Sequence, residues 1–132
     1  VWAEVVHSPR AFRCFSGAEQ PIVSLAGEPV AAFCGLGNPA GFRHTLHVCR
    51  CRVVDFREFA DHYRYAQADI DALAHWADRL DAAAVVTTHK DLVKVGVERL
   101  GRLPLWAVTI ALDFLTGQEE FEAKLRELLP GK

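Results

Sequence analysis

The sequence has 132 residues, of which 51% are hydrophobic and 24% charged, which suits one globular domain that closes a core without disulfides or metals. Its formal net charge of -2 argues against nucleic acid as a main partner, because phosphate binding favours a basic face. The longest apolar runs, residues 29–36 and 105–112, are far shorter than the roughly 20 residues that cross a bilayer, so we expect a compact, soluble domain.

The start of the chain differs in pattern from the rest. It begins at Val1 and contains no methionine, so we expect the C-terminal part of a larger protein. Residues 1–28 combine short extended pieces with serine, proline and glycine, which is typical of a linker or a hairpin. Residues 29–132 are expected to form one α/β domain.

From residue 29 onward, short apolar runs alternate with amphipathic segments, as in consecutive βα units. The expected strands are residues 30–34, 51–56, 82–87 and 105–112. Helices are expected after the first three strands, and a last helix at 118–129. Asn38 and Thr88 are the expected N-caps of two of them, with Asp91 in the first turn after Thr88. The apolar faces expected to be buried are Phe42, Leu46 and Cys49 in the first helix and Ile70, Leu73, Ala77 and Leu80 in the second. Right-handed crossovers then predict a mostly parallel sheet of about four strands flanked by helices.

Cysteine and histidine give little support for a metal site. The four cysteines are expected to be reduced, since a chain of this size needs no disulfides. Cys49 and Cys51 lack CxxC spacing, and although their side chains would share one face in a strand, they are interpreted as small buried hydrophobic residues. His44 and His47 could share a helix face, but no third ligand accompanies them, so we expect surface histidines.

Three loops follow the first three strands, and parallel strands bring such loops to one edge of the sheet. Backbone amides at Gly35, Gly37 and Asn38 could bind an anion at a helix N-terminus, or these residues could form only a tight turn. Lys90 could meet a phosphate or be an ordinary surface charge.

Asp61 and His62 are the strongest candidates for chemistry. They lie in the loop after the second strand among aromatic residues, and an acid can fix or tune an imidazole that moves protons. The alternative is an exposed loop pair. The chain has no GxxxxGK[ST] motif, so this pair is interpreted as half of a site whose other half lies elsewhere.

Three separated motifs in this order resemble the tetraacyldisaccharide 4'-kinases, also called lipid A 4'-kinases. They are AFCGLGNP at residues 32–39, FADHYRY at 59–65 and THKDLVK at 88–94, followed by Trp106. The resemblance covers roughly residues 29–112 and is far more specific than any single motif.

The resemblance implies ATP-dependent phosphorylation of the 4'-hydroxyl of a tetraacyldisaccharide 1-phosphate, giving lipid IVA at the cytoplasmic face of the Gram-negative inner membrane. It implies that ATP and Mg²⁺ bind mainly to an N-terminal P-loop lobe, which also contacts the membrane, and that residues 1–28 form a two-stranded hinge. His62 would orient and tune an aspartate of that lobe, with Asp61 supporting it.

The chain departs from the family pattern at two positions in these motifs. His89 stands where glutamate is usual, and Tyr63 where a second histidine is common, while Asp61 and His62 are retained. The resemblance therefore implies a C-terminal lobe that is inactive without the P-loop lobe. The alternative is a non-catalytic α/β binding or scaffold domain, in which the same loops are only caps and turns.

Overall fold

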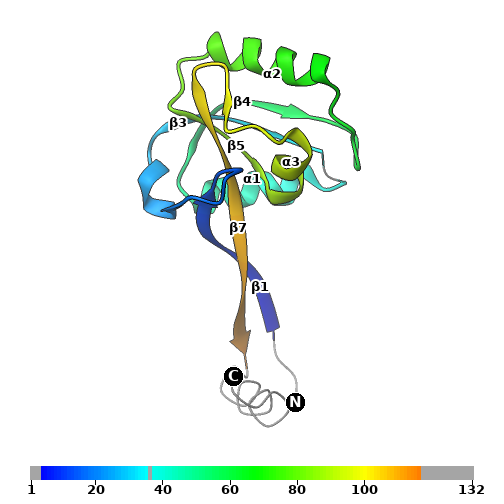
Figure 1. Ribbon diagram of the computed structural model, residues 1–132. Helices are drawn as coiled ribbons and strands as arrows, with labels where there is room; N and C mark the ends of the chain where they lie inside the picture. Colours follow the sequence, from blue (N-terminus) through cyan, green and yellow to red (C-terminus); the bar gives the residue numbers. More distant parts are fainter. Residues whose placement is uncertain (1–3, 36, 117–132) are drawn as a thin grey trace. The chain divides into compact units, whose positions relative to one another are not determined.

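The computed structural model describes residues 4–35 and 37–116 (Figure 1). The elements in chain order are β1 (Glu4–Arg13), β2 (Glu19–Pro21), the 3-10 helix η1 (Ile22–Leu25), β3 (Pro29–Cys34), α1 (Pro39–Val48), β4 (Arg52–Glu58), α2 (Gln67–Asp78), β5 (Ala84–Thr88), α3 (His89–Val95), β6 (Arg99–Leu100) and β7 (Leu103–Thr116). The helix expected at 118–129 lies outside the described residues.

The chain divides into two compact units, residues 9–109 and residues 1–8 together with 110–132. In the described part of the second unit, the backbone continues strands β1 and β7. The elements that carry the candidate site residues all belong to residues 9–109. The predicted division at residue 28 stays a prediction.

The strands form one mixed sheet with the order β2-β1-β7-β5-β3-β4. Strand β3 is parallel to both β4 and β5, and β5 is parallel to β7. These are the four predicted strands, so the parallel core is confirmed. The number was wrong, because the described residues hold seven strands: β2 pairs antiparallel with β1, and β6 with β7.

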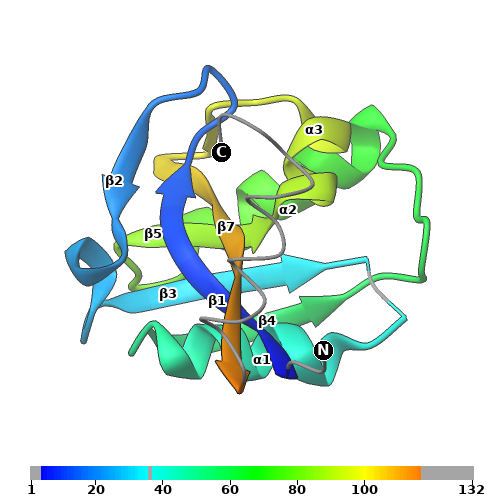
Figure 2. The same ribbon diagram turned by 90° about the horizontal axis from the view of Figure 1, so that it is seen from below.

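The two faces of the central sheet carry separate cores, as side-chain alternation along each strand requires. Ala31, Phe33 and Val85 face α2 and α3, whereas Val30, Ala32 and Val86 face α1 and η1. Figures 1 and 2 show helices on both sides of β3 and β5. Strands β3 and β5 are buried along nearly their whole length because both of their faces are covered. Strand β4 lies at the edge of the sheet, carries charged residues and is partly exposed.

The predicted helix faces are confirmed where the structure describes them. Phe42 and Leu46 of α1 are buried, as are Leu73 and Ala77 of α2. Cys49, expected on the same face of the first helix, is also buried and occupies the C-cap position of α1. Cys51, expected as the first residue of the next strand, lies immediately before β4.

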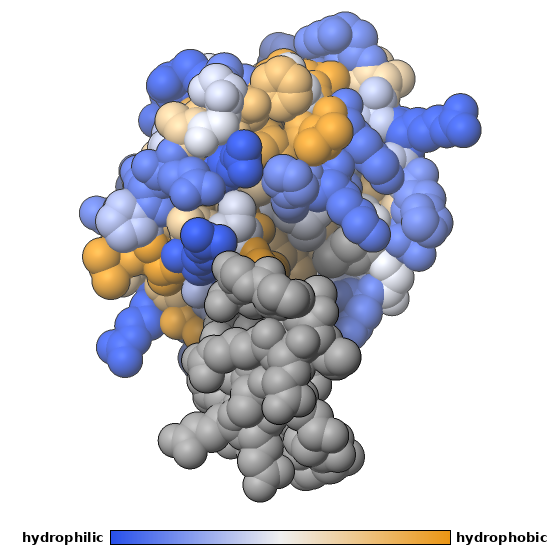
Figure 3. Space-filling model, turned by 60° about the horizontal axis from the view of Figure 1, so that its bottom comes forward, coloured by the Kyte–Doolittle hydropathy of each residue, from blue (hydrophilic) through white to orange (hydrophobic). Residues whose placement is uncertain are grey.

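Much of the described surface is polar. Figure 3 shows one face on which hydrophilic residues predominate and hydrophobic residues form separate patches. Exposed large hydrophobic side chains are Phe15, Val23, Val48, Val54, Val93 and Ile110. None of the helices in the described part of the chain is long and apolar enough to cross a membrane.

Candidate functional site

The predicted site residues all lie at one edge of the sheet. Parallel strands β3, β4 and β5 end at Cys34, Glu58 and Thr88, so the segments that follow them start side by side. Gly35, Gly37 and Asn38 follow β3, Asp61 and His62 follow β4, and Lys90 follows β5. The convergence expected from the βα pattern is therefore present at the carboxyl edge.

Asp61 and His62 occupy the central positions of a tight turn. The Tyr63 amide donates to the Ala60 carbonyl at 3.0 Å, and His62 has a φ of 59°, a left-handed value uncommon for residues other than glycine. His62 Nε2 lies 3.7 Å from Asp61 Oδ2. The side chains are 86% exposed for His62 and 53% exposed for Asp61, so the pair faces solvent.

The turn projects from a well-anchored loop. The Phe59 amide donates to the Cys34 carbonyl at 2.8 Å, which ties the start of the loop to the end of β3. Tyr63 donates its hydroxyl to Asp69 of α2 at 2.8 Å, and Lys94 of α3 donates to the Tyr63 carbonyl at 3.3 Å. An exposed pair on a braced turn is suited to meeting a group from outside this loop.

Aromatic rings fill the space beneath the turn. The Tyr65 ring packs edge-on against Phe33 and Phe59, with centroids 5.9 and 5.2 Å apart. Tyr63 lies 4.9 Å from Phe59 by the same measure. Burial and the nearby Asp91 carboxylate raise the pKa of Tyr65 above its ordinary value, so its phenol stays protonated and acts as a donor.

Asp91 is a buried acid that contacts more of the site than its position in the sequence predicted. Its side chain is only 1% exposed, and it accepts hydrogen bonds from the Gly35 amide at 3.1 Å, the Tyr65 hydroxyl at 3.0 Å and the Thr88 hydroxyl at 2.5 Å. The Thr-x-x-Asp spacing suggested only a helix cap. Thr88 does cap α3, accepting from the Asp91 amide at 3.2 Å, but the same carboxylate also binds the two other loops.

Both glycines after β3 allow close approach of other groups. A Cβ at Gly35 would lie 3.1 Å from the Ala60 carbonyl oxygen and 3.2 Å from Asp91 Oδ1, and one at Gly37 would lie 3.2 Å from Asp61 Oδ2. The Asp61 carboxylate therefore sits directly against the backbone of Gly37. The structure brings Gly37, Asp61 and His62 together.

Asn38 and Lys90 share this edge, but the structure shows no contact from either to Asp61 or His62. Asn38 occupies the N-cap position of α1, with Pro39 in the first turn, but its side chain makes no capping hydrogen bond. Lys90 is exposed, and among the described residues it has no hydrogen-bond or ion-pair partner. Their predicted contact with phosphate stays a prediction.

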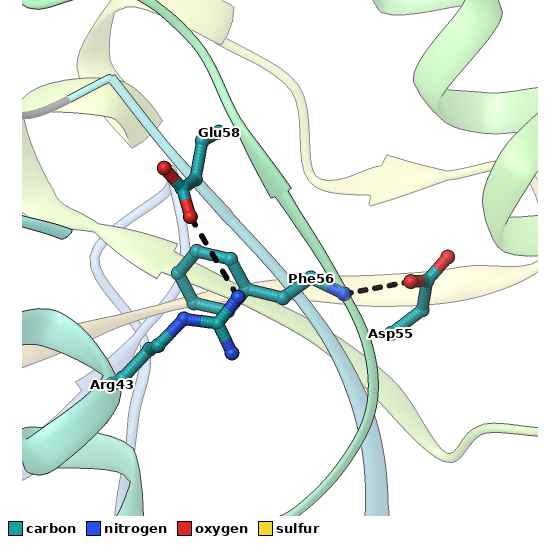
Figure 4. A network of polar contacts seen from close by, with 4 residues as sticks. All are labelled: Arg43, Asp55, Phe56 and Glu58. Atoms are coloured by element: carbon teal, nitrogen blue, oxygen red, sulfur yellow. Dashed lines mark hydrogen bonds and ion pairs between the residues drawn. The ribbon is translucent and has the colours of Figure 1, made fainter. Parts of the chain in front are cut away.

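Helix α1 is braced against the end of β4 beside the site. The Arg43 guanidinium lies 3.9 Å from the ring centroid of Phe56, and one of its nitrogens lies 3.7 Å from a Glu58 carboxylate oxygen (Figure 4). The ion pair is about half exposed and contributes little stability alone. Glu58 is the last residue of β4, from which the Asp61 loop departs.

The remaining cysteine and histidine residues form no comparable constellation. None of the four cysteines forms a disulfide, and no group of three or more metal-ligating side chains occurs in the part of the chain that the structure describes. The His44 and His47 rings are exposed, with centroids 6.5 Å apart. An open hollow of about 610 Å³ is lined by residues from the end of α1 to the start of β4, away from the carboxyl edge.

Residues 3–130 match the family model described as Tetraacyldisaccharide-1-P 4'-kinase. A tetraacyldisaccharide 4'-kinase from Syntrophus aciditrophicus is 31% identical over 125 residues, covering 94% of this chain and 33% of that protein. One from Rhodopseudomonas palustris strain BisB18 is 42% identical over 81 residues, covering 61% and 23%. The chain thus spans about a third or less of the curated relatives it matches.

A solved structure agrees in fold. The crystal structure of LpxK from Aquifex aeolicus in complex with ATP superposes with a TM-score of 0.61 and 22% identity, covering 94% of this chain and 35% of that one. The family match along nearly the whole sequence confirms the resemblance carried by the three motifs. The chain belongs to the tetraacyldisaccharide 4'-kinase family.

Proposed function

We propose that this chain is the C-terminal lobe of an ATP-dependent kinase that phosphorylates the 4'-hydroxyl of a tetraacyldisaccharide 1-phosphate to give lipid IVA. The rest of the site would come from an N-terminal P-loop lobe of the same protein, working at the cytoplasmic face of the inner membrane. Support comes from the family match and from a sequence without a GxxxxGK[ST] motif of its own. The lobe alone would be inactive.

The observation that carries the proposal is the exposed Asp61–His62 pair on its braced turn. Phosphoryl transfer requires positioning of the two substrates, neutralisation of charge and a base aimed at the attacking hydroxyl. An imidazole that is 86% exposed can contact a carboxylate of a second lobe when the lobes close. In this mechanism His62 orients that carboxylate and tunes its basicity, while Asp61, 3.7 Å away, stabilises the charged imidazole.

The neighbouring residues would assist with phosphate. The N-terminus of α1, entered through Gly35, Gly37 and Asn38, carries the positive end of a helix dipole. Lys90 would supply a mobile positive charge from the start of α3. Both lie at the edge that carries the Asp61–His62 pair.

The described part of this chain has no group of three or more histidine, cysteine, aspartate or glutamate side chains that could hold a metal ion. In kinases Mg²⁺ is held by one or two carboxylates together with the substrate phosphates. In this proposal the P-loop lobe binds ATP and supplies those carboxylates. No step assigned to this chain depends on either ligand's position.

The test is transfer of the labelled γ-phosphate of ATP to tetraacyldisaccharide 1-phosphate by the full-length protein. We expect His62→Ala to lower kcat by about 100-fold or more, as when the base that His62 orients is misplaced by about 1 Å, with little change in the KM for ATP. His44→Ala is the matched control, because His44 is also an exposed histidine but lies on α1. It should react at the wild-type rate.

Two outcomes would contradict the proposal at different points. Transfer by His62→Ala at the wild-type rate would remove His62 from the mechanism. Absence of any transfer by the folded full-length wild type would favour the non-catalytic binding or scaffold domain instead.

A further inference from the structure

Asp91 contacts all three loops of the candidate site, although the mechanism above gives it no task. We propose that Asp91 is a positioning residue for the Asp61–His62 pair, acting through the Tyr65 hydroxyl and the Gly35 amide. The inference rests on the proposed function, because it assigns Asp91 a role in presenting His62 to the reaction. Asp91 itself is buried beneath the loops and contacts no reacting group.

Every group that faces the Asp91 carboxylate in these contacts is a donor. Oδ1 accepts from the Tyr65 hydroxyl, and Oδ2 accepts from the Gly35 amide and the Thr88 hydroxyl. A buried carboxylate is stable only when such donors replace its lost water. In Asp91→Asn, the side-chain NH₂ would replace one of the two oxygens and face a hydrogen-bond donor. The site is therefore specific for a carboxylate.

The Tyr65 contact fixes the far end of the loop that carries His62. Its near end is held by the hydrogen bond from Phe59 to Cys34, and its far end by the Tyr65 hydroxyl on Asp91. The turn with His62 lies between these two anchors, and Tyr63 beside it is also held by Asp69 and Lys94. Releasing the Tyr65 end would let the exposed turn sample more positions, and misplacement by about 1 Å can cost about 100-fold in rate.

The hydrogen bond from the Gly35 amide to Asp91 holds the segment after β3, against which the Asp61 side chain lies. Gly35 begins the segment that contains Gly37, and the Asp61 carboxylate rests against Gly37. One buried carboxylate therefore holds both the loop that bears the pair and the backbone that the pair leans on. A helix cap alone would require only the Thr88 contact.

The test combines Tyr65→Phe and Asp91→Asn with His62→Ala in the full-length protein. Tyr65→Phe removes one hydroxyl and keeps the ring packed on Phe33 and Phe59, so it remains informative where Asp91→Asn fails to fold. We expect Tyr65→Phe to lower kcat by about 10-fold and Asp91→Asn by about 100-fold, with the KM for ATP within about twofold. Because both act through His62, neither should lower kcat further when His62 is already alanine.

Thr87→Val is the control for loss of a buried hydroxyl at this edge, because Thr87 donates to the Phe33 carbonyl at 2.8 Å and does not contact Asp91. It should lower the melting temperature but leave kcat within about twofold. If Tyr65→Phe has wild-type kcat, or if its loss persists unchanged in the His62→Ala protein, Asp91 is structural only and the inference is wrong. Failure of the proposed function is distinct, since His62→Ala alone would then show no effect.

Discussion

Gly35 and Gly37 follow the same strand, but an added methyl group would meet different atoms at the two positions. At Gly35 it would press on the Ala60 carbonyl, the Asp91 carboxylate and the Tyr65 hydroxyl, at 3.1 to 3.3 Å. At Gly37 it would meet only the Asp61 side chain, which is half exposed and free to move. The atoms around Gly35 belong to the backbone and to buried side chains and cannot move aside easily, whereas the Asp61 side chain beside Gly37 can.

We therefore expect Gly35→Ala to destabilise the fold by about 1–3 kcal/mol, as for overpacking a filled site. Gly37→Ala should change the free energy of unfolding by less than about 0.5 kcal/mol but displace Asp61 and reduce phosphoryl transfer. Urea unfolding and the kinase assay on both variants separate the two effects. Equal losses of stability would show that the two glycines do not differ in this way.

At the residue scale, the sequence predicted some residues of the candidate site and could not predict the role of others. Asp61 and His62 were predicted because two polar groups followed an apolar strand. The left-handed φ of His62 was not predicted, since histidine rarely signals such a turn. Asp91 was predicted as a capping acid because its spacing from Thr88 explained it locally, and the contacts to Gly35 and Tyr65 depend on tertiary packing that spacing does not encode.

Helix α2 begins with an incomplete capping box. The Asp69 carboxylate accepts from the Ala66 amide at 2.8 Å, but Ala66 at the N-cap has no side-chain oxygen to accept from the first turn. Its backbone already has extended N-cap geometry, with φ -83° and ψ 167°. A serine there would complete the reciprocal pair.

Ala66→Ser is expected to stabilise the fold by about 1 kcal/mol. Thermal or urea unfolding would measure the gain. Asp69→Ala removes the half already present together with the Tyr63 hydrogen bond, so Tyr63→Phe, which removes that second bond alone, is measured beside it. If Ala66→Ser were neutral in the wild type, the N-terminus of α2 would not limit stability.

At the scale of elements, strands β3 and β5 and residues 105–112 of β7 are apolar runs typical of buried parallel strands, so they were predictable. The edge strand β4 carries charged residues and was indicated only by its neighbouring β-branched residues Val53 and Val54. Strands β2 and β6 have only three and two residues, too few for a recognisable pattern. Strand β1 runs through Ser8 and Pro9, which suggested an interruption because proline lacks a backbone donor.

For the whole molecule, the buried thiols predict a loss of stability at high pH. Burial, with a smaller effect from Cys51, raises the pKa of Cys49 from 9.0 to about 12, and burial raises that of Cys51 to about 11. The folded state thus keeps these protons while the unfolded chain releases them from pH 9.0 upward. The two protonated thiols therefore contribute their full stabilisation of the fold below pH 9.0. This contribution decreases as the pH rises toward the folded-state pKa values of about 11 and about 12.

Cys49, which is 1% exposed, should account for about 1.4 kcal/mol of this loss by about pH 10, one unit above its ordinary pKa. Urea unfolding at about pH 8 and 10 measures it. Cys49→Ala should start less stable because of the cavity it leaves, yet lose less between the two pH values. An equal fall in both proteins would contradict the assignment to Cys49.

The central claim is that His62 serves the chemical step of a site completed by a second lobe. A single-turnover measurement tests it most directly, because full-length protein with ATP already bound separates the transfer step from binding and product release. We expect His62→Ala to slow 4'-phosphoryl transfer in that turnover by about 100-fold or more, with unchanged affinity for ATP. A single-turnover rate equal to that of the wild type would contradict the account.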